Sequence, residues 1–218
     1  MCDLKRSLMR KRLRNHSHNL LFGMKNPKSK GSRFERDVAK QLSLWWSGGQ
    51  RDDIFYRSSS SGARATCRAV KNKNTANSAG DLSYLDASGK PFLECVAVEI
   101  KAGYKGATIP KIFSAKKPEL YDFFDQAQES AIQANVPGWL VIHKQDFQPT
   151  MVYMNSWLFD RYFGMDVIDV GLDNLKFPSP LLFIRISDDR LVLCFKFDDF
   201  LKFDPSRFRM DVLCPDDT

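Results

Sequence analysis

Residues 96–101 hold the pair of side chains in this sequence that is best suited to chemistry. In the run Val-Ala-Val-Glu-Ile-Lys, bulky aliphatic residues occupy alternate positions, so the strand period of two places Glu99 and Lys101 together on the opposite face. A Glu/Lys pair on the open face of a strand is common and usually has no catalytic role. Its significance depends on what the rest of the fold brings to it.

Asp81 is the second carboxylate that the fold could bring there. It follows a glycine, and residues 82–86 and 92–101 are predicted to pair as an antiparallel hairpin, which would return Asp81 to the vicinity of Glu99. Two carboxylates repel each other unless a cation lies between them, and oxygen ligands favour Mg²⁺ or Mn²⁺. Lys101 would then orient water and offset the charge that grows on a phosphate during hydrolysis. The alternative is that Asp81 only caps a turn.

A predicted helix over residues 33–46 offers a third carboxylate. Apolar residues recur there at helical spacing, and Ser32 followed three positions later by Glu35 matches the capping box that begins many helices. The pair Gly48-Gly49 is expected to end the helix. Glu35 therefore has two interpretations: it caps its own helix, or it reaches the carboxylate site from that helix.

The remaining pattern predicts an α/β domain. Strands are expected at 54–56, 139–143 and 151–154, a helix at 119–135, and a hairpin from 181–186 and 191–197. Between these elements, residues 58–80 have no periodicity, and a loop of that length is usually functional or disordered. Aromatic residues near the C-terminus could stack on bases, but in strands they more often form the core. They are Phe183, Phe195, Phe197, Phe200 and Phe203.

The basic charge of the chain is concentrated at its N-terminus. The net charge is +7 over 218 residues, and residues 1–30 alone hold nine Lys/Arg against one acidic residue, Asp3. A basic arm releases counterions from a phosphate backbone and so supplies salt-sensitive, sequence-independent affinity for nucleic acid. The alternative is a solvated tail whose charge only keeps the protein soluble.

Composition excludes several classes of protein. A content of 43% hydrophobic and 12% aromatic residues indicates a packed core, and no apolar run approaches the ~18 residues of a membrane span. The charged N-terminus lacks the apolar core of a secretory signal, so we expect a cytoplasmic protein. Five widely separated cysteines without a CxxC pair predict neither a disulfide framework nor a structural zinc site. His143, at a strand end, is expected to be structural.

Together these motifs resemble the PD-(D/E)XK nuclease superfamily, and specifically its Holliday-junction resolvase branch. The resemblance covers about residues 30–157 and depends on the order of four features. They are the helix start KGSRFER (30–36), the Ser-rich run 58–62, the GD…VEIK pair (80–81 and 98–101) and the helix followed by a strand at 121–144. Glycine stands at position 80, where the name of the superfamily places proline.

The resemblance assigns roles to the site residues. Asp81 and Glu99 would be metal ligands, assisted by the backbone carbonyl of Ile100, and the cofactor would be Mg²⁺ or Mn²⁺. Lys101 would be the catalytic lysine, and Glu35 a carboxylate that reaches the metal from the first helix. A glutamine that faces the site in related nucleases corresponds to Gln126, to Gln128 or to neither.

The resemblance also implies a fold and a domain organisation. The fold is restriction-endonuclease-like, a central mixed β-sheet flanked by helices. A basic arm (1–30) precedes the nuclease core (31–160), and a C-terminal β-hairpin extension (161–218) packs on the core.

The implied function is metal-dependent cleavage of DNA at four-way junctions by a homodimer. The alternatives are a restriction-like or replication-repair nuclease of the same fold, and a DNA-binding protein without catalysis. Basic and hydroxyl side chains of the arm and of the Ser-rich loop are the expected DNA contacts. They are Lys11, Arg12, Arg14, Lys30, Arg33, Arg57, Ser59, Ser60, Arg64, Arg68, Lys71 and Lys73.

Overall fold

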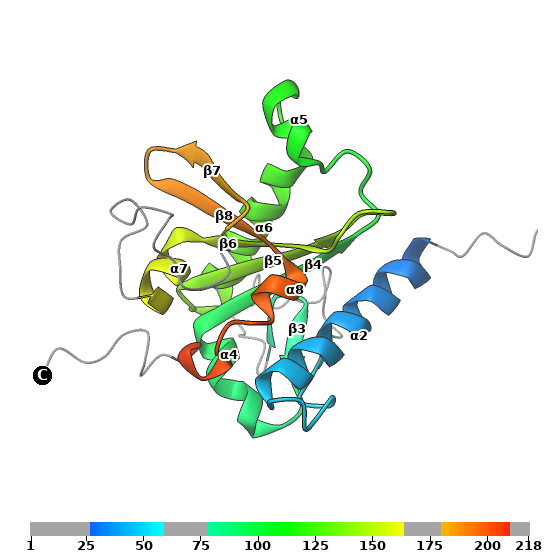
Figure 1. Ribbon diagram of the computed structural model, residues 1–218, viewed down its shortest axis with the longest axis vertical. Coiled ribbons are helices and arrows are strands. Elements are labelled where there is room, and N and C mark those ends of the chain that lie inside the picture. Colours follow the sequence, from blue (N-terminus) through cyan, green and yellow to red (C-terminus); the bar gives the residue numbers. More distant parts are fainter. Residues whose placement is uncertain (1–26, 59–77, 164–179, 210–218) are drawn as a thin grey trace, which may run out of the picture.

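The computed structural model describes residues 27–58, 78–163 and 180–209, which form two β-sheets with helices around them (Figure 1). The larger sheet contains, in spatial order, β4 (Val96–Ala102), β5 (Gly138–Lys144), β6 (Met151–Asn155), β8 (Arg190–Lys196) and β7 (Leu182–Ser187). The smaller sheet has the order β1 (Phe55–Arg57), β3 (Leu82–Tyr84) and β2 (Ser78–Ala79). This mixed α/β architecture confirms the predicted fold class and is consistent with a restriction-endonuclease-like fold.

One parallel pair in the larger sheet carries the candidate site. β4 and β5 are parallel, and the chain returns between them through α5 (Ile109–Ser114) and α6 (Glu119–Ala134). Parallel neighbours require such a crossover, whereas the antiparallel pair β5–β6 is joined by the short turn 145–150. The strands predicted at 139–143 and 151–154 and the helix predicted at 119–135 are confirmed within a residue or so.

α6 covers one face of the larger sheet. In the register of β4 and β5, Glu99 and Lys101 share a face with Trp139. Trp139 donates a hydrogen bond from Nε1 to Oε1 of Gln128 on α6 (2.9 Å), and its ring stacks on Phe124 of the same helix with centroids 5.8 Å apart. The side chains that carry chemistry on β4 therefore face α6.

The other face is covered by aromatic side chains from α2 (Pro27–Trp46), α7 (Ser156–Phe163) and α8 (Phe197–Phe200). Phe195 of β8 packs against Phe159 of α7 and against Phe203. Trp45 of α2 contacts the ring of Phe200 (5.2 Å between centroids) and donates a hydrogen bond to the carbonyl of Phe203 (2.8 Å). The C-terminal aromatic residues thus belong to the core, as expected. Phe183 is the one of the predicted five that is only partly buried.

α2 begins earlier than its apolar periodicity predicts. The helix starts at Pro27, and proline is favoured in the first turn because its missing N–H is not needed there. Ser32 therefore lies inside the helix, so the capping box predicted at Ser32 and Glu35 is wrong. The end is as predicted, because Gly48 and Gly49 follow Trp46 with φ of +62° and +88°.

The hairpin predicted from residues 82–86 and 92–101 is also wrong. The chain leaves β3 through a 3₁₀ turn (Ala87–Gly89) and α4 (Lys90–Cys95), and only then enters β4. Pro91 suits the first turn of α4, and Phe92 and Leu93 are both buried although neighbouring strand residues point to opposite faces. β3 pairs with β1 and β2 and not with β4.

The described part of the C-terminal segment completes the larger sheet. β7 and β8 form the predicted hairpin, and β8 pairs with β6, so this hairpin extends the sheet that contains the site strand. The boundary expected at residue 160 stays a prediction. Cys95 and Cys194 are buried in the core, and the other three cysteines lie outside the described residues. No helix in the described ranges is long and apolar enough to cross a membrane.

Candidate active site

Asp81 reaches β4 through a close backbone approach. Gly80 forms an isolated parallel bridge with Val98, and the N–H of Asp81 donates to the Val98 carbonyl (2.7 Å). Gly80 has φ +75°, and a Cβ added there would lie 2.4 Å from the Val98 oxygen. Proline, whose φ is fixed near −65°, could not take this position, so the departure from the superfamily name has a backbone reason.

Two carboxylates and one ammonium meet beside this bridge. Lys101 Nζ donates to Glu99 Oε2 (2.7 Å) and lies 4.0 Å from Asp81 Oδ2. The N–H of Ile100 donates to Asp81 Oδ2 (3.0 Å), so the strand backbone itself holds that carboxylate. Asp81 is 8% exposed and Glu99 is 7% exposed. The structure therefore brings together the three predicted residues, although by a parallel bridge and not by the predicted hairpin.

Burial and mutual repulsion perturb this group. Burial, and next the negative charge of Glu99, raise the pKa of Asp81 from 3.8 to about 7, against the opposing effects of Lys101 and the Ile100 N–H. For Lys101, burial alone would lower the pKa, but the charges of Glu99 and Asp81 outweigh it and raise the pKa above the ordinary value of 10.5. Lys101 is thus a fixed ammonium and not a base at neutral pH.

Glu35 borders the site from α2. Its Oε2 accepts a charged hydrogen bond from Nε of Arg57 on β1, and its charge contributes to the raised pKa of Asp81. Because α2 begins at Pro27, Glu35 lies beyond the first helical turn, which excludes the capping interpretation. The structure also pairs Arg57, an expected DNA contact, with a carboxylate of the site.

Ser130 of α6 is a site residue that the sequence interpretation missed. Its hydroxyl donates to Glu99 Oε1 (2.7 Å), which leaves Oε2 to Lys101. Neither of the two glutamines considered for this helix contacts the site carboxylates. Gln126 is exposed, and Gln128 accepts a hydrogen bond from Trp139. Ser130 follows the buried Phe123 by two helical turns, so helical periodicity already placed it on the covered face.

Phe123 and His143 close the apolar side of the site. Lys101 Nζ lies 6.0 Å from the Phe123 ring centroid, and His143 packs edge-on against the same ring (5.5 Å). His143 is buried, which lowers its pKa to about 4 and keeps it neutral. Its Nε2 has no hydrogen-bond partner among the described residues. This packing is the structural role expected of it.

The other predicted DNA contacts are largely untested. Arg33 is exposed on α2, 3.9 Å from Asp37, and Lys30 belongs to the same helix. The rest lie outside the described residues, and their role stays a prediction. They are Lys11, Arg12, Arg14, Ser59, Ser60, Arg64, Arg68, Lys71 and Lys73.

The donor set of the site fits a hard divalent cation. Both acidic side chains offer carboxylate oxygens, the ligand type that Mg²⁺ and Mn²⁺ prefer, and burial of this like-charged pair favours a bound cation. Within the described ranges, no group of three or more His, Cys, Asp or Glu side chains is gathered as a metal site. The Ile100 carbonyl, water and the substrate are further oxygen ligands that such a cation would accept, and Glu35 is not gathered with Asp81 and Glu99 as a third ligand.

A Gly-Asp bridged to a Glu-x-Lys strand, on a mixed sheet between helices, defines the PD-(D/E)XK class of nuclease site. The chain belongs to the family described as "Phage putative PDDEXK endonuclease", whose model matches residues 26–169. This membership indicates a nuclease acting on DNA, and nucleases of this class generally use divalent metal ions. It confirms the superfamily and does not extend to the Holliday-junction resolvase branch. Neither curated proteins nor solved structures gave a match.

Proposed function

We propose that this chain is a metal-dependent DNA endonuclease whose active site is formed by Asp81, Glu99 and Lys101. The observation that carries this proposal is the convergence of two buried carboxylates on one lysine. Burial of like charges destabilises a fold, so the arrangement is explained by chemistry and not by stability. A carboxylate pair would also repel phosphate, which disfavours a DNA-binding protein without a bound cation.

Each residue has a task in this mechanism. Asp81 and Glu99, together with the Ile100 carbonyl, would hold a divalent cation, which would supply Lewis-acid polarisation of the phosphate and a more acidic water. The Ile100 N–H fixes Asp81, and the Ser130 hydroxyl fixes Glu99. The Lys101 ammonium orients the attacking water and offsets charge that develops on the phosphate.

The finer assignment is resolution of four-way DNA junctions. It is supported by the order of the motifs from the KGSRFER helix start through GD…VEIK. A four-way junction has two-fold symmetry, and symmetric cutting needs two sites, so a homodimer belongs to this proposal. The products would be nicks in opposing strands with 5′-phosphate ends.

One gel tests both levels of the proposal. Labelled four-way junction, matched duplex and single strand are incubated with the full chain in Mg²⁺, Mn²⁺ or EDTA. Cation-dependent cleavage of the junction in preference to duplex is expected, and light scattering should report a dimer. Equal cleavage of junction and duplex by a monomer would favour a restriction-like or repair nuclease. If the protein binds DNA but does not cleave it with either metal, the proposal that it is an endonuclease is wrong.

The basic arm is assigned to backbone affinity. Removal of residues 1–26, which hold seven Lys/Arg and precede α2, should weaken DNA binding and reduce the slope of log affinity against log salt concentration. Cleavage at saturating DNA should persist, because the deletion contains no residue of the site. If the slope of log affinity against log salt concentration does not change, the arm is a solvated tail and does not contact the DNA backbone.

A further inference from the structure

Two connections leave the sheet at the edge where the site strand ends. Residues 103–108 follow β4, and the turn 145–150 follows β5. The side-chain amide of Gln145 donates to the carbonyls of Tyr104 (2.8 Å) and Ala107 (3.3 Å), and the Gly103 N–H donates to the Lys144 carbonyl (3.0 Å). These bonds join the two connections into one surface beside the active site.

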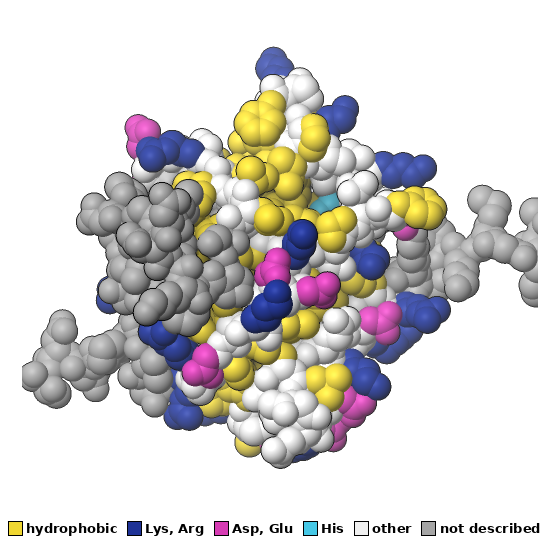
Figure 2. Space-filling model, in the orientation of Figure 1, with side chains coloured by type: hydrophobic (Ala, Val, Ile, Leu, Met, Phe, Trp, Pro, Cys, Tyr) yellow, Lys and Arg dark blue, Asp and Glu magenta, His cyan; other side chains and the backbone are white. Residues whose placement is uncertain are grey.

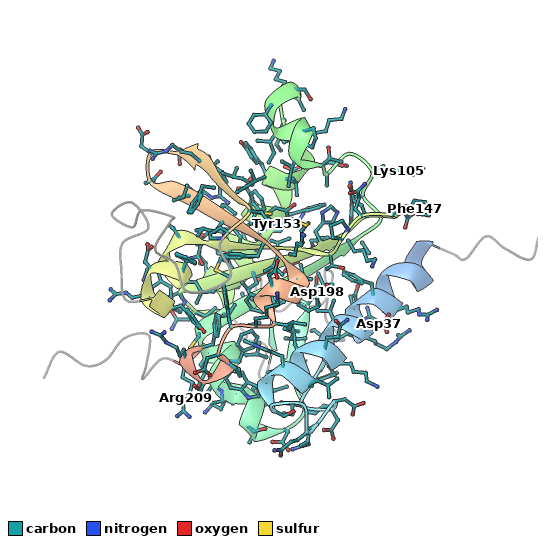
Figure 3. All side chains as sticks on the ribbon, viewed as in Figure 1. Asp37, Lys105, Phe147, Tyr153, Asp198 and Arg209 are labelled. Carbon is teal, nitrogen blue, oxygen red and sulfur yellow. The ribbon has the colours of Figure 1, made fainter. Side chains whose placement is uncertain are left out.

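Phe147 is held on this surface in an unusual way. It has φ +62°, a left-handed conformation that favours glycine, and its side chain is fully exposed. Figure 3 shows it projecting outward at the edge of the sheet, as Lys105 does. Since the ring is open to solvent, packing against the described residues does not account for a bulky residue at a strained position.

A second aromatic ring connects this surface to the catalytic lysine. Tyr104 is 44% exposed, and its ring meets the edge of Phe123 with centroids 4.9 Å apart. Phe123 in turn lies over Lys101 Nζ. Tyr104 is therefore linked to Lys101 through the single ring of Phe123.

The surface around the rings carries both basic and acidic side chains. Lys105 and Lys144 are exposed, Asp146 lies in the second connection, and the carboxylate of Glu119 lies against Gly106 in the first. Figure 2 shows Lys and Arg side chains along the edge of the molecule between α5 and α2, interspersed with apolar and acidic ones. Basic side chains mixed with exposed aromatic rings are typical of surfaces that bind single-stranded nucleic acid.

We propose that Phe147 and Tyr104 stack on unpaired bases of the DNA substrate, while Lys105 and Lys144 contact the phosphates beside them. The inference rests on the proposed nuclease function and names its substrate class: DNA with unpaired or splayed bases next to the scissile phosphate. A fully stacked duplex does not present base faces to such rings, whereas a branch point or bulge does. These rings would then direct the nuclease to irregular DNA.

The test measures binding in EDTA, so that it does not depend on cleavage. Anisotropy of labelled DNA gives the affinity of the full chain for a duplex with a three-nucleotide bulge and for the matched duplex. Because one aromatic stack changes affinity by roughly 5-fold to 100-fold, Phe147→Ala should lower the bulge-to-duplex affinity ratio by about tenfold. Phe147→Trp should restore the ratio.

Two further variants guard against trivial causes. Phe147→Gly removes the ring but suits the left-handed backbone, so loss of the ratio in this variant cannot come from misfolding. Leu85→Ala removes an exposed apolar side chain from the turn after β3 and should leave the ratio unchanged. A 2-aminopurine in the bulge should be quenched by the wild type and not by Phe147→Ala.

The outcomes separate this inference from the proposed function. If the wild type prefers the bulge and the two ring-removing variants do not, the stacking surface is supported. If Phe147→Ala binds both DNAs like the wild type, the inference is overturned and the ring serves another partner, such as a protein. If the wild type binds neither DNA in EDTA and cleaves neither with Mg²⁺ or Mn²⁺, the proposed nuclease function itself fails.

Discussion

The two faces of the five-stranded sheet are built by different means. On the face covered by α2, α7 and α8, the rings of Trp45, Phe200 and Phe208 pack against one another, and apolar burial is what they contribute. On the α6 face, at the end of β4, the side chains of Asp81 and Glu99 are also buried but are carboxyl groups, and specific hydrogen bonds position each one. Packing on the first face stabilises the fold, whereas the buried carboxylates on the second face lower its stability.

The largest difference between the faces should appear in catalysis. Lys101→Ala removes the ammonium that both carboxylates share, so cleavage at saturating DNA should fall by roughly a thousandfold or more, because the members of a catalytic unit act together. Single-turnover cleavage with Mg²⁺ measures this loss. Lys90→Ala, which removes an exposed lysine on α4, should cleave like the wild type. If Lys101→Ala cleaves DNA at a rate within tenfold of the wild-type rate, Lys101 has no essential role in the mechanism.

Substitution of a buried aromatic residue on the face covered by α2, α7 and α8 should lower the stability of the protein. Phe200→Ala leaves a cavity among Trp45, Phe203 and Phe208, and should lower the free energy of unfolding by about 3–5 kcal/mol. Urea titration followed by tryptophan fluorescence measures it. Phe113→Ala, at an exposed position on α5, should change stability by less than about 0.5 kcal/mol. If Phe200→Ala and Phe113→Ala lower the free energy of unfolding equally, the aromatic packing does not stabilise the fold as the comparison of the two faces requires.

The carboxylate pair should make stability depend on pH when metal is absent. The pKa of Asp81 is about 7 in the folded protein and ordinarily 3.8, so the folded state holds this proton more tightly than the unfolded chain. The free energy of unfolding therefore loses this contribution as pH rises from about 4 to about 7. Asp81→Asn lacks the effect and should be more stable than the wild type at pH 8 in EDTA, by on the order of 2 kcal/mol.

Urea unfolding at pH 5 and pH 8 in EDTA measures that difference. His143 has the opposite effect on stability. Because burial lowers its pKa to about 4, the free energy of unfolding falls as pH drops below 6.5. His143 is present in both proteins, so its effect cancels in the comparison. A stability difference between Asp81→Asn and the wild type that is the same at both pH values would show that repulsion within the pair is unimportant.

Ser130→Ala should have the smallest effect. It leaves Glu99 in place but frees Oε1, so the Mn²⁺ concentration for half-maximal cleavage should rise by about tenfold while stability changes little. Ser130→Thr keeps the hydroxyl and should remain close to the wild type. A half-maximal Mn²⁺ concentration that does not move in Ser130→Ala would mean that the hydrogen bond does not position the ligand.

Strong periodicity made much of this fold predictable. The helix around 119–135 and the strands β5, β6 and β8 have long regular patterns that match their burial. Residues 92–95 were predicted to begin a strand but are helical, because apolar residues in a short run fit a strand and a short helix equally well. The start of α2 was missed because its first turns contain polar residues, with only Pro27 as a signal.

The site was predictable to the extent that its motif is local. Glu99 and Lys101 share a strand face by periodicity alone, but the approach of Asp81 depends on a left-handed Gly80 that no pattern of side chains shows. Periodicity places Ser130 on the covered face of its helix but does not show that it bonds Glu99, and no pattern in the sequence marks Phe147. A serine on a helix and a phenylalanine in a turn acquire meaning only from what the fold places beside them, or leaves exposed.

The central claim is that Asp81 and Glu99 together hold a divalent cation that cleavage requires. The most direct test compares the wild type with Glu99→Gln in single-turnover cleavage of saturating DNA, with Mg²⁺, Mn²⁺ or EDTA. We expect the wild type to cleave only with a cation, and Glu99→Gln to bind DNA and unfold like the wild type yet cleave at less than about a hundredth of its rate. Cleavage by the wild type in EDTA, or a variant that keeps more than about a tenth of the rate, would contradict the claim.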